Sequence, residues 1–247
     1  MKIRFGQYVR GLAVLALMSS IGAAPAAATD TDNIPIKVHQ RAKVQFPIRA
    51  LNLGILRGEA SLMMDVDHTG RVVDVLAFAY TRREFADSAL DAVKHWRFTP
   101  GRSGGEPVGS MITLTVMFEV TGVLAYVKPI AASEEENATG DQFAYQPIAT
   151  AALDHVPAAL QRDGPIYPRQ WIDEGRTGAV TVEFFIDETG AVRLPRVVGK
   201  ADEFLGAASV AAVRTWRFEP PRHKGRPVLT RASQVFTFHP EPNARKT

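Results

Sequence analysis

The sequence contains no cysteine among its 247 residues, which excludes disulfide bridges, thiol catalysis and cysteine-ligated metal sites. Its 16 prolines are scattered and form no Pro-rich tract. No apolar run reaches the roughly 20 residues that a membrane-spanning helix needs. The formal net charge is only +3, so the composition does not point to nucleic acid as a partner. The remaining composition, 46% hydrophobic and 22% charged, is typical of a folded globular protein.

The first 28 residues differ in composition from the rest of the chain. They carry three basic and no acidic residues, an apolar run over residues 12–21, and three alanines immediately before Thr29. This pattern predicts a secretory signal peptide over residues 1–28, and therefore an exported protein. The alternative is an uncleaved membrane anchor. Gly22 and Pro25 interrupt the end of the apolar run, which favours the signal peptide.

The most informative feature that is present is an internal repeat. The segment Trp96-Arg97-Phe98-Thr99-Pro100 recurs 120 residues later as Trp216-Arg217-Phe218-Glu219-Pro220. A constant offset over about 60 residues indicates a duplicated unit rather than one large fold. The same offset relates further identical residues: Gly58 and Gly178, Asp67 and Asp187, Gly70 and Gly190, Arg102 and Arg222, Gly105 and Gly225, Pro107 and Pro227, and Phe118 and Phe238.

The repeat divides the chain into two units, each with the predicted order α-β-β-α-β. The expected segments are an N-terminal segment over 29–42, a first unit over 43–126, a linker over 127–146, a second unit over 147–240 and a tail over 241–247. Within each unit, alternation of apolar and polar residues predicts strands and an apolar stripe predicts a helix. The elements expected in the first unit are a helix over 48–56, strands over 60–66 and 72–78, a helix ending at Trp96 and a strand over 112–120.

Two local patterns refine the predicted helix and the predicted hairpin. Thr81 and Glu84 have the spacing of a capping box, which would begin the second helix. Asp67 and Asp187 lie in the turns between the first two strands, where aspartate commonly accepts hydrogen bonds from its own backbone. Trp96, like its copy in the second unit, ends the apolar stripe of a helix and is expected to pack on the sheet.

The order of strands follows from handedness and from one proline. A crossover through a helix joins strand two to strand three, which should then be parallel and right-handed. The hairpin makes strand one antiparallel to strand two, so strand one lies in the middle. Pro195 falls in strand two of the second unit, and proline is found on edge strands. We therefore predict an α+β fold of two tandem units, each with a three-stranded sheet in the order 2-1-3 and two helices packed on it.

In this arrangement, strand three of each unit is an open edge of its sheet. An edge strand offers unpaired backbone donors and acceptors to an extended segment of another protein. The residues expected to line these edges and bind a partner are Met111, Thr113, Thr115 and Met117 in the first unit, and Arg231, Ser233, Val235 and Thr237 in the second.

The ordered set of motifs, which occurs twice, resembles the C-terminal domain of the TonB energy-transducer family. The motif residues are Phe46, Pro47, Trp96, Arg97, Phe98 and Pro100 in the first unit, and Tyr167, Pro168, Trp216, Arg217, Phe218 and Pro220 in the second. The resemblance implies a periplasmic domain that binds an extended segment of an outer-membrane TonB-dependent receptor, or of another envelope protein, in support of transport. Transducers of this family usually also keep an uncleaved N-terminal span and a Pro-rich spacer, and this sequence departs from both features.

No pattern in the sequence predicts a catalytic site, a cofactor or a metal. The segment Gly101–Gly105 matches Gly-x-Ser-x-Gly but follows a predicted helix, whereas a nucleophile elbow follows a strand. The six histidines lack the spacing of metal ligands. The basic stretch from Arg214 to Arg231 is either a solvated rim or a contact for an anionic partner. Two other functions stay open: a structural module in which third strands pair, for example in a homodimer, and a transducer anchored in the inner membrane.

Overall fold

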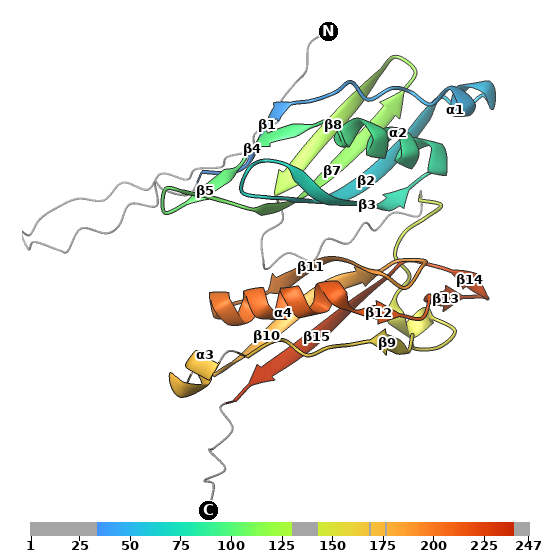
Figure 1. Ribbon diagram of the computed structural model, residues 1–247. Helices are drawn as coiled ribbons and strands as arrows, with labels where there is room; N and C mark the ends of the chain where they lie inside the picture. The colour runs from blue at the N-terminus through green and yellow to red at the C-terminus, as the bar shows by residue number, and fades with distance from the viewer. Residues whose placement is uncertain (1–33, 130–142, 168, 176, 240–247) are drawn as a thin grey trace, which may run out of the picture. The chain divides into compact units, whose positions relative to one another are not determined.

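The computed structural model describes residues 34–129, 143–167, 169–175 and 177–239 (Figure 1). These residues all belong to a single folded unit. The predicted signal peptide, most of the predicted linker and the predicted tail lie outside the described residues. In the described part of the chain, no helix has the length and the apolar character needed to cross a membrane.

The first repeat forms a four-stranded antiparallel sheet in the order β3-β2-β7-β8. Helix α2 lies across one face of this sheet (Figure 1), and the core forms where its buried residues, such as Phe85, meet Leu62 and Leu114. The elements are α1 (Ile48–Asn52), β2 (Arg57–Val66), β3 (Val72–Tyr80), α2 (Arg83–Val93), β7 (Ser110–Glu119) and β8 (Gly122–Pro129).

Strand β8 corrects the predicted three-stranded sheet of the first unit. It pairs with β7 along eight residues, from Glu119 opposite Gly122 to Ile112 opposite Pro129. Two residues join these strands, which is the shortest common hairpin connection. The segment is suited to this place because Val123 and Ala125, two positions apart, both pack on the core. Strand β7 is therefore internal, and part of the segment expected to be linker is a strand.

The second repeat forms a three-stranded sheet in the order β11-β10-β15, with antiparallel neighbours. Helix α4 covers one face of this sheet (Figure 1), and Leu205 and Val213 of the helix pack with Val182 of β10 in its core. Pro195 lies on the outer strand β11. The elements are α3 (Arg169–Asp173), β10 (Gly178–Ile186), β11 (Val192–Val198), α4 (Glu203–Thr215) and β15 (Thr230–Phe238).

Short strands that the sequence did not predict complete both repeats in the same way. Gln40 lies opposite Arg97 in the first repeat, and Gln161 lies opposite Arg217 in the second. The first of these strands, Lys37–Gln40, lies in the N-terminal segment over 29–42, for which the sequence predicted no strand or helix. These elements are β1 (Lys37–Gln40), β4 (Arg97–Thr99), β5 (Gly101–Ser103), β6 (Glu106–Val108), the 3-10 helix η1 (Thr150–Ala152), β9 (Ala159–Gln161), β12 (Arg217–Phe218), β13 (Arg222–His223) and β14 (Arg226–Pro227).

The hairpin turns confirm the role expected for the two aspartates. One carboxylate oxygen of Asp67 accepts hydrogen bonds from the backbone N–H groups of Thr69 (2.8 Å) and Arg71 (3.0 Å). The turn of the second repeat repeats this pattern with Asp187. Position 190, three residues after Asp187, has no room for a side chain. A Cβ on Gly190, at φ 84°, would lie 1.9 Å from the backbone oxygen of Phe218. The repeated turn and the repeated Trp-Arg-Phe motif therefore pack against each other.

The tryptophans pack on the sheets as expected, whereas the predicted capping box is wrong. Trp96 and Trp216 are 1% and 2% exposed. Helix α2 has Arg82 as its N-cap residue, without a side-chain hydrogen bond to the helix. The hydroxyl of Thr81 instead accepts a hydrogen bond from the backbone N–H of Glu59 (3.0 Å). A neighbouring strand thus competes successfully with the helix for this hydroxyl group.

Candidate functional site at the edge strand of the second repeat

The candidate site is the outer side of β15, the last strand of the second sheet. Residues opposite each other in an antiparallel pair share a face of the sheet. Phe236 lies opposite Val180 and Gln234 opposite Val182, so these two β15 residues share the face covered by α4. Val235, which alternates with them, lies on the other face and is 54% exposed.

The backbone of β15 presents alternate residues to the outside of the sheet. The carbonyl of Leu229 accepts a hydrogen bond from the N–H of Ile148 (2.8 Å), and the carbonyl of Arg231 accepts one from the Thr150 hydroxyl (3.0 Å). These acceptors therefore point away from β10. Because the N–H and C=O of one residue point to the same side in an antiparallel strand, the odd-numbered residues up to 237 direct both groups outward.

The beginning of this edge is already covered by the chain itself. Ile148 forms a parallel bridge with Thr230, whose hydroxyl donates to the Ile148 carbonyl (2.7 Å). Arg231 is further held with its guanidinium 5.3 Å from the centre of the Phe185 ring. In the described part of the chain, no strand pairs with the outer side of residues 232–238. The accessible part of the edge is therefore residues 232–238.

The two repeats differ in burial at this edge. Ile112, Leu114 and Val116 of β7 are completely buried, while their copies Ala232, Gln234 and Phe236 in β15 are only half-buried. The first repeat has β8 beside these residues, and the second has no described strand in that place. The open side of β15 is thus the position at which the first repeat carries an added strand.

The predicted binding residues separate into two groups. Ser233, Val235 and Thr237 lie on the open part of β15, and Arg231 lies at its covered beginning. The open edge predicted for the first repeat is wrong over the residues that β8 covers, because β8 pairs with β7 from Ile112 to Glu119. This correction applies to Thr113, Thr115 and Met117, whereas Met111 lies just before the paired stretch.

A polar cluster beside β15 was missed by the sequence analysis. The Arg162 guanidinium donates to the side-chain oxygen of Gln234 (2.6 Å) and lies 5.0 Å from the centre of the Trp216 ring. The side-chain amide of Gln234 donates to the Val235 carbonyl (2.6 Å), one of the outward-facing acceptors. The only signal in the sequence is the polar residue Gln234 at the position of Leu114 in an otherwise apolar pattern.

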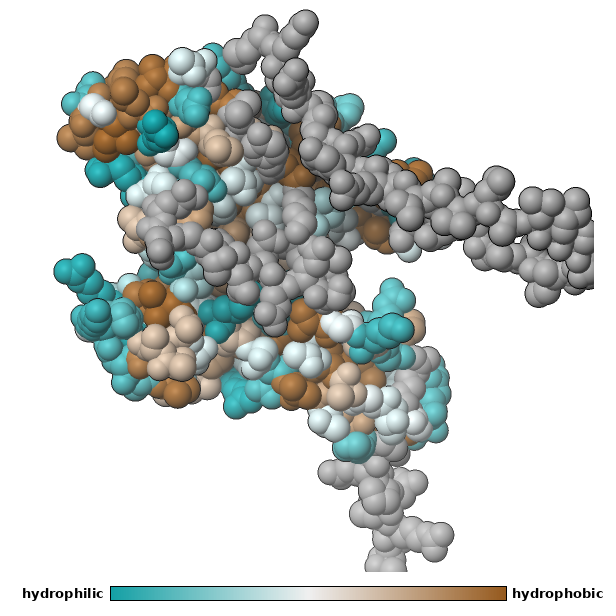
Figure 2. Space-filling model, turned by 180° about the vertical axis from the view of Figure 1, so that it is seen from behind, coloured by the Kyte–Doolittle hydropathy of each residue, from teal (hydrophilic) through white to brown (hydrophobic). Residues whose placement is uncertain are grey.

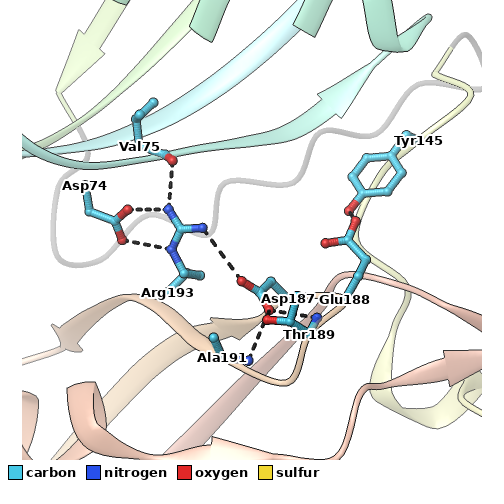
Figure 3. A network of polar contacts seen from close by, with 8 residues as sticks. All are labelled: Asp74, Val75, Tyr145, Asp187, Glu188, Thr189, Ala191 and Arg193. Atoms are coloured by element: carbon cyan, nitrogen blue, oxygen red, sulfur yellow. Dashed lines mark hydrogen bonds and ion pairs between the residues drawn. The ribbon is translucent and has the colours of Figure 1, made fainter. Parts of the chain in front are cut away.

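Contacts between residues of the two repeats do not involve pairing of their third strands. Figure 3 shows Arg193 of β11 donating to the carboxylate of Asp74 and to the carbonyl of Val75, and facing Asp187. The hydrogen bond with Asp74 raises the pKa of the Arg193 guanidinium above its ordinary value. A buried cluster lies in the same contact: Met63, Leu76, Phe78, Ala79, Phe185, Leu194 and Leu229. The hypothesis that the third strands pair between the units of one chain is therefore wrong for the described residues.

Tyr145, in the segment that connects the repeats, contacts a tyrosine ring of the first repeat and a glutamate of the second. The Tyr145 ring stacks on Tyr80 with 4.5 Å between the ring centres, and its hydroxyl donates to Glu188 (Figure 3). Burial raises the pKa of Tyr145, and the hydrogen bond with Glu188 adds to this effect. Tyr145 therefore stays protonated, as a hydrogen-bond donor, to a higher pH than a free tyrosine does.

The basic stretch from Arg214 to Arg231 is partly paired inside the protein. Arg214 donates to the carboxylate of Asp65 (2.8 Å). The tip of the β13–β14 hairpin is fixed by Asp154, which accepts from the backbone N–H groups of Lys224 and Gly225, both at 2.7 Å. These hydrogen bonds hold the pKa of the Asp154 carboxyl below its ordinary value. The contact with an anionic partner stays a prediction.

The motif residues form the framework around the site. The Phe46 ring packs edge-to-face on Phe85, and the Tyr167 ring packs in the same way on Phe238, at the end of β15. The indole N–H of Trp216 donates to the carbonyl of Asp163 (2.7 Å). Pro168 lies outside the described residues. No group of three histidine, aspartate or glutamate side chains that could hold a metal occurs within the ranges that the structure describes.

These features define a small α+β domain, present twice, in which the outer side of β15 has no strand partner over residues 232–238 among the described residues. The family model described as Gram-negative bacterial TonB protein C-terminal matches residues 42–120 and again residues 163–240, and the chain belongs to this family. The family is transport-associated and non-enzymatic, and it relates the chain to the cell envelope, TonB-dependent transport and receptor binding. Strand β8 lies beyond the first matched segment, whereas β15 lies within the second.

Among solved structures, the chain is similar to the TonB C-terminal domain of Pseudomonas aeruginosa, determined by solution NMR. The two are 31% identical, the match covers 35% of this chain and 89% of that chain, and the TM-score is 0.31. The search of curated proteins found no match.

Proposed function

We propose that this chain is a periplasmic, non-enzymatic docking protein. It binds an extended segment of an outer-membrane TonB-dependent receptor, or of another envelope protein, by adding that segment as a strand to residues 232–238 of β15. The single observation that carries this proposal is the comparison within the chain: an added strand, β8, occupies the corresponding edge of the first repeat. Family membership supports the class of partner.

Strand β8 indicates how the bound segment lies. It runs antiparallel to β7 and places Val123 opposite Phe118 and Ala125 opposite Val116, where both pack on the core. A segment on β15 would place small apolar side chains opposite Phe238 and Phe236 in the same way. Its backbone N–H replaces the side chain of Gln234 at the Val235 carbonyl, and Arg162 offers a positive donor nearby.

Isotope-labelled protein titrated with synthetic N-terminal segments of receptors tests this proposal by NMR. Amide signals of residues 232–238 should shift, while those of residues 112–118 should not, because β8 already pairs with β7. Absence of any shift in residues 232–238 at millimolar peptide would contradict strand addition for these partners.

Substitution of one backbone donor separates strand addition from side-chain contact. Val235→Pro removes an outward N–H without removing a hydrogen bond to β10, since residue 235 faces outward. We expect peptide binding about 2- to 10-fold weaker, the value of one net hydrogen bond of roughly 0.5–1.5 kcal/mol. Val235→Thr keeps the N–H and serves as the matched control. Equal affinities of the two variants would show that the backbone of this residue does not pair with the peptide.

A further inference from the structure

The end of the first repeat that carries α1 exposes a cluster of aliphatic side chains, here called the α1 patch. Figure 2 shows a brown area at this end of the first repeat. The backbone N–H of Val120 donates to the Leu56 carbonyl (3.1 Å), which joins the β7–β8 turn to the patch. The patch consists of Ile48, Leu51, Leu53, Leu56 and Val120, whose exposed fractions lie between 46% and 73%.

The second repeat does not preserve this surface, so the fold does not require it. The glycine that ends each short helix has a positive φ, 70° at Gly54 and 65° at Gly175, which aligns the two segments. Leu53 in the first repeat then corresponds to Glu174 in the second, where the Gln170 side chain donates to its carboxylate (3.0 Å). A polar residue is therefore accepted at this place in the same local structure.

The composition of the α1 patch fits the surface of a lipid bilayer better than a protein partner. The patch is purely aliphatic, whereas the energetic centres of protein interfaces are enriched in tryptophan, tyrosine and arginine. The exposed residues Arg49 and Arg57 flank it, and Glu119 lies opposite Arg57. Aliphatic side chains with basic neighbours are typical of segments that lie in the headgroup region of a membrane and pair with lipid phosphates.

We propose that the α1 patch is a membrane-docking surface that inserts its aliphatic side chains between the headgroups of a phospholipid bilayer, with Arg49 and Arg57 beside lipid phosphates. This proposal goes beyond binding at β15 and does not depend on it, since the patch lies on the other repeat. A protein held at a membrane by its first repeat presents the edge of the second repeat to partners near that membrane.

Fluorescence at a single engineered cysteine tests the proposal, because the chain has no cysteine of its own. Leu53→Cys labelled with a polarity-sensitive dye should show a blue shift when the full chain is mixed with vesicles of phosphatidylethanolamine and phosphatidylglycerol. The matched control is Glu174→Cys with the same dye, which should show no shift. A shift of equal size at both positions, or at neither, would overturn the proposal.

Vesicle sedimentation of an unlabelled variant provides an independent measurement. Leu53→Glu introduces the residue of the second repeat and should weaken vesicle binding about tenfold, the value of one leucine withdrawn from an apolar environment. Val156→Glu makes the same kind of change at another exposed aliphatic residue and should leave vesicle binding unchanged. Unchanged binding by Leu53→Glu would overturn the proposal. Loss of self-association in that variant, without any vesicle binding by the parent protein, would overturn it in favour of a second copy as the occupant.

Discussion

Detachment of β8 should convert the first repeat into a second binding unit. In the double variant Val123→Asp/Ala125→Asp, both new carboxylates lie on the face of β8 that packs against the core. Both positions are half-buried, so each carboxylate would lose part of its hydration without gaining a partner if β8 stayed in place. The substitutions also remove the apolar contacts that hold β8 on the core, so we expect β8 to leave β7 and expose the same kind of edge that β15 presents.

The advantage of β8 over a free peptide at the edge of β7 follows from the short connection between β7 and β8. Because only two residues join β8 to β7, the effective concentration of β8 at this edge is on the order of millimolar or higher. A free peptide at about 1 µM therefore competes at a disadvantage of roughly a thousandfold or more. The parent protein should bind one peptide per chain, and the double variant should bind two.

Titration calorimetry measures this stoichiometry, and amide exchange in residues 112–118 reports whether β8 has left. Val73→Asp is the matched control, because Val73 is an exposed residue of β3 in the same sheet and its substitution does not contact β8. Suppose that β7 exchanges freely in the double variant and Trp96 remains buried, yet only one peptide binds. The inference that an empty edge is sufficient for binding would then be refuted.

Two further predictions concern the repeated hairpin turns. Gly190→Ala should lower the free energy of unfolding by about 3 kcal/mol, because its Cβ would collide with the Phe218 carbonyl at a positive φ. Gly104→Ala, at φ 58° with no atom within 4 Å, should cost only about 1 kcal/mol in the same urea titration. The Thr69 hydrogen bond holds the pKa of Asp67 below its ordinary value, so the associated stability is present above pH ~4 and is lost as the pH falls through the lower folded-state pKa. Asp67→Asn should therefore reduce the acid dependence of the melting temperature, and an unchanged pH profile would contradict this assignment.

The elements that the sequence predicted well are those in which local pattern and tertiary packing agree. The turn of Asp187 is encoded by residues adjacent in sequence, and its hydrogen bonds are local. Trp216 ends an apolar stripe that can be buried only against the sheet, so its burial was predictable. The duplicated spacing then fixed the same elements in the other half of the chain.

The elements that were missed depend on pairing between distant segments or on differences between the repeats. Strand β8 lies beyond the repeated motifs, so the duplication predicts an open third strand in both sheets, although in the first repeat β8 covers it. The strand at Lys37–Gln40 has one apolar residue, Val38, which packs on the core, and its backbone partner Arg97–Thr99 lies far away in the sequence. The contact between Arg162 and Gln234 joins residues 72 positions apart, and no local pattern encodes such a distance.

The lengthwise pairing of β10 with β15 also has a mechanical consequence. Nine residue pairs connect these strands, and β10 is in turn held by the core beneath α4. If a segment is added to β15 as proposed, tension along that segment would load its hydrogen bonds in shear, all at the same time. Tension perpendicular to the strand would instead break them one after another, so such a joint would resist tension in one direction and release in the other.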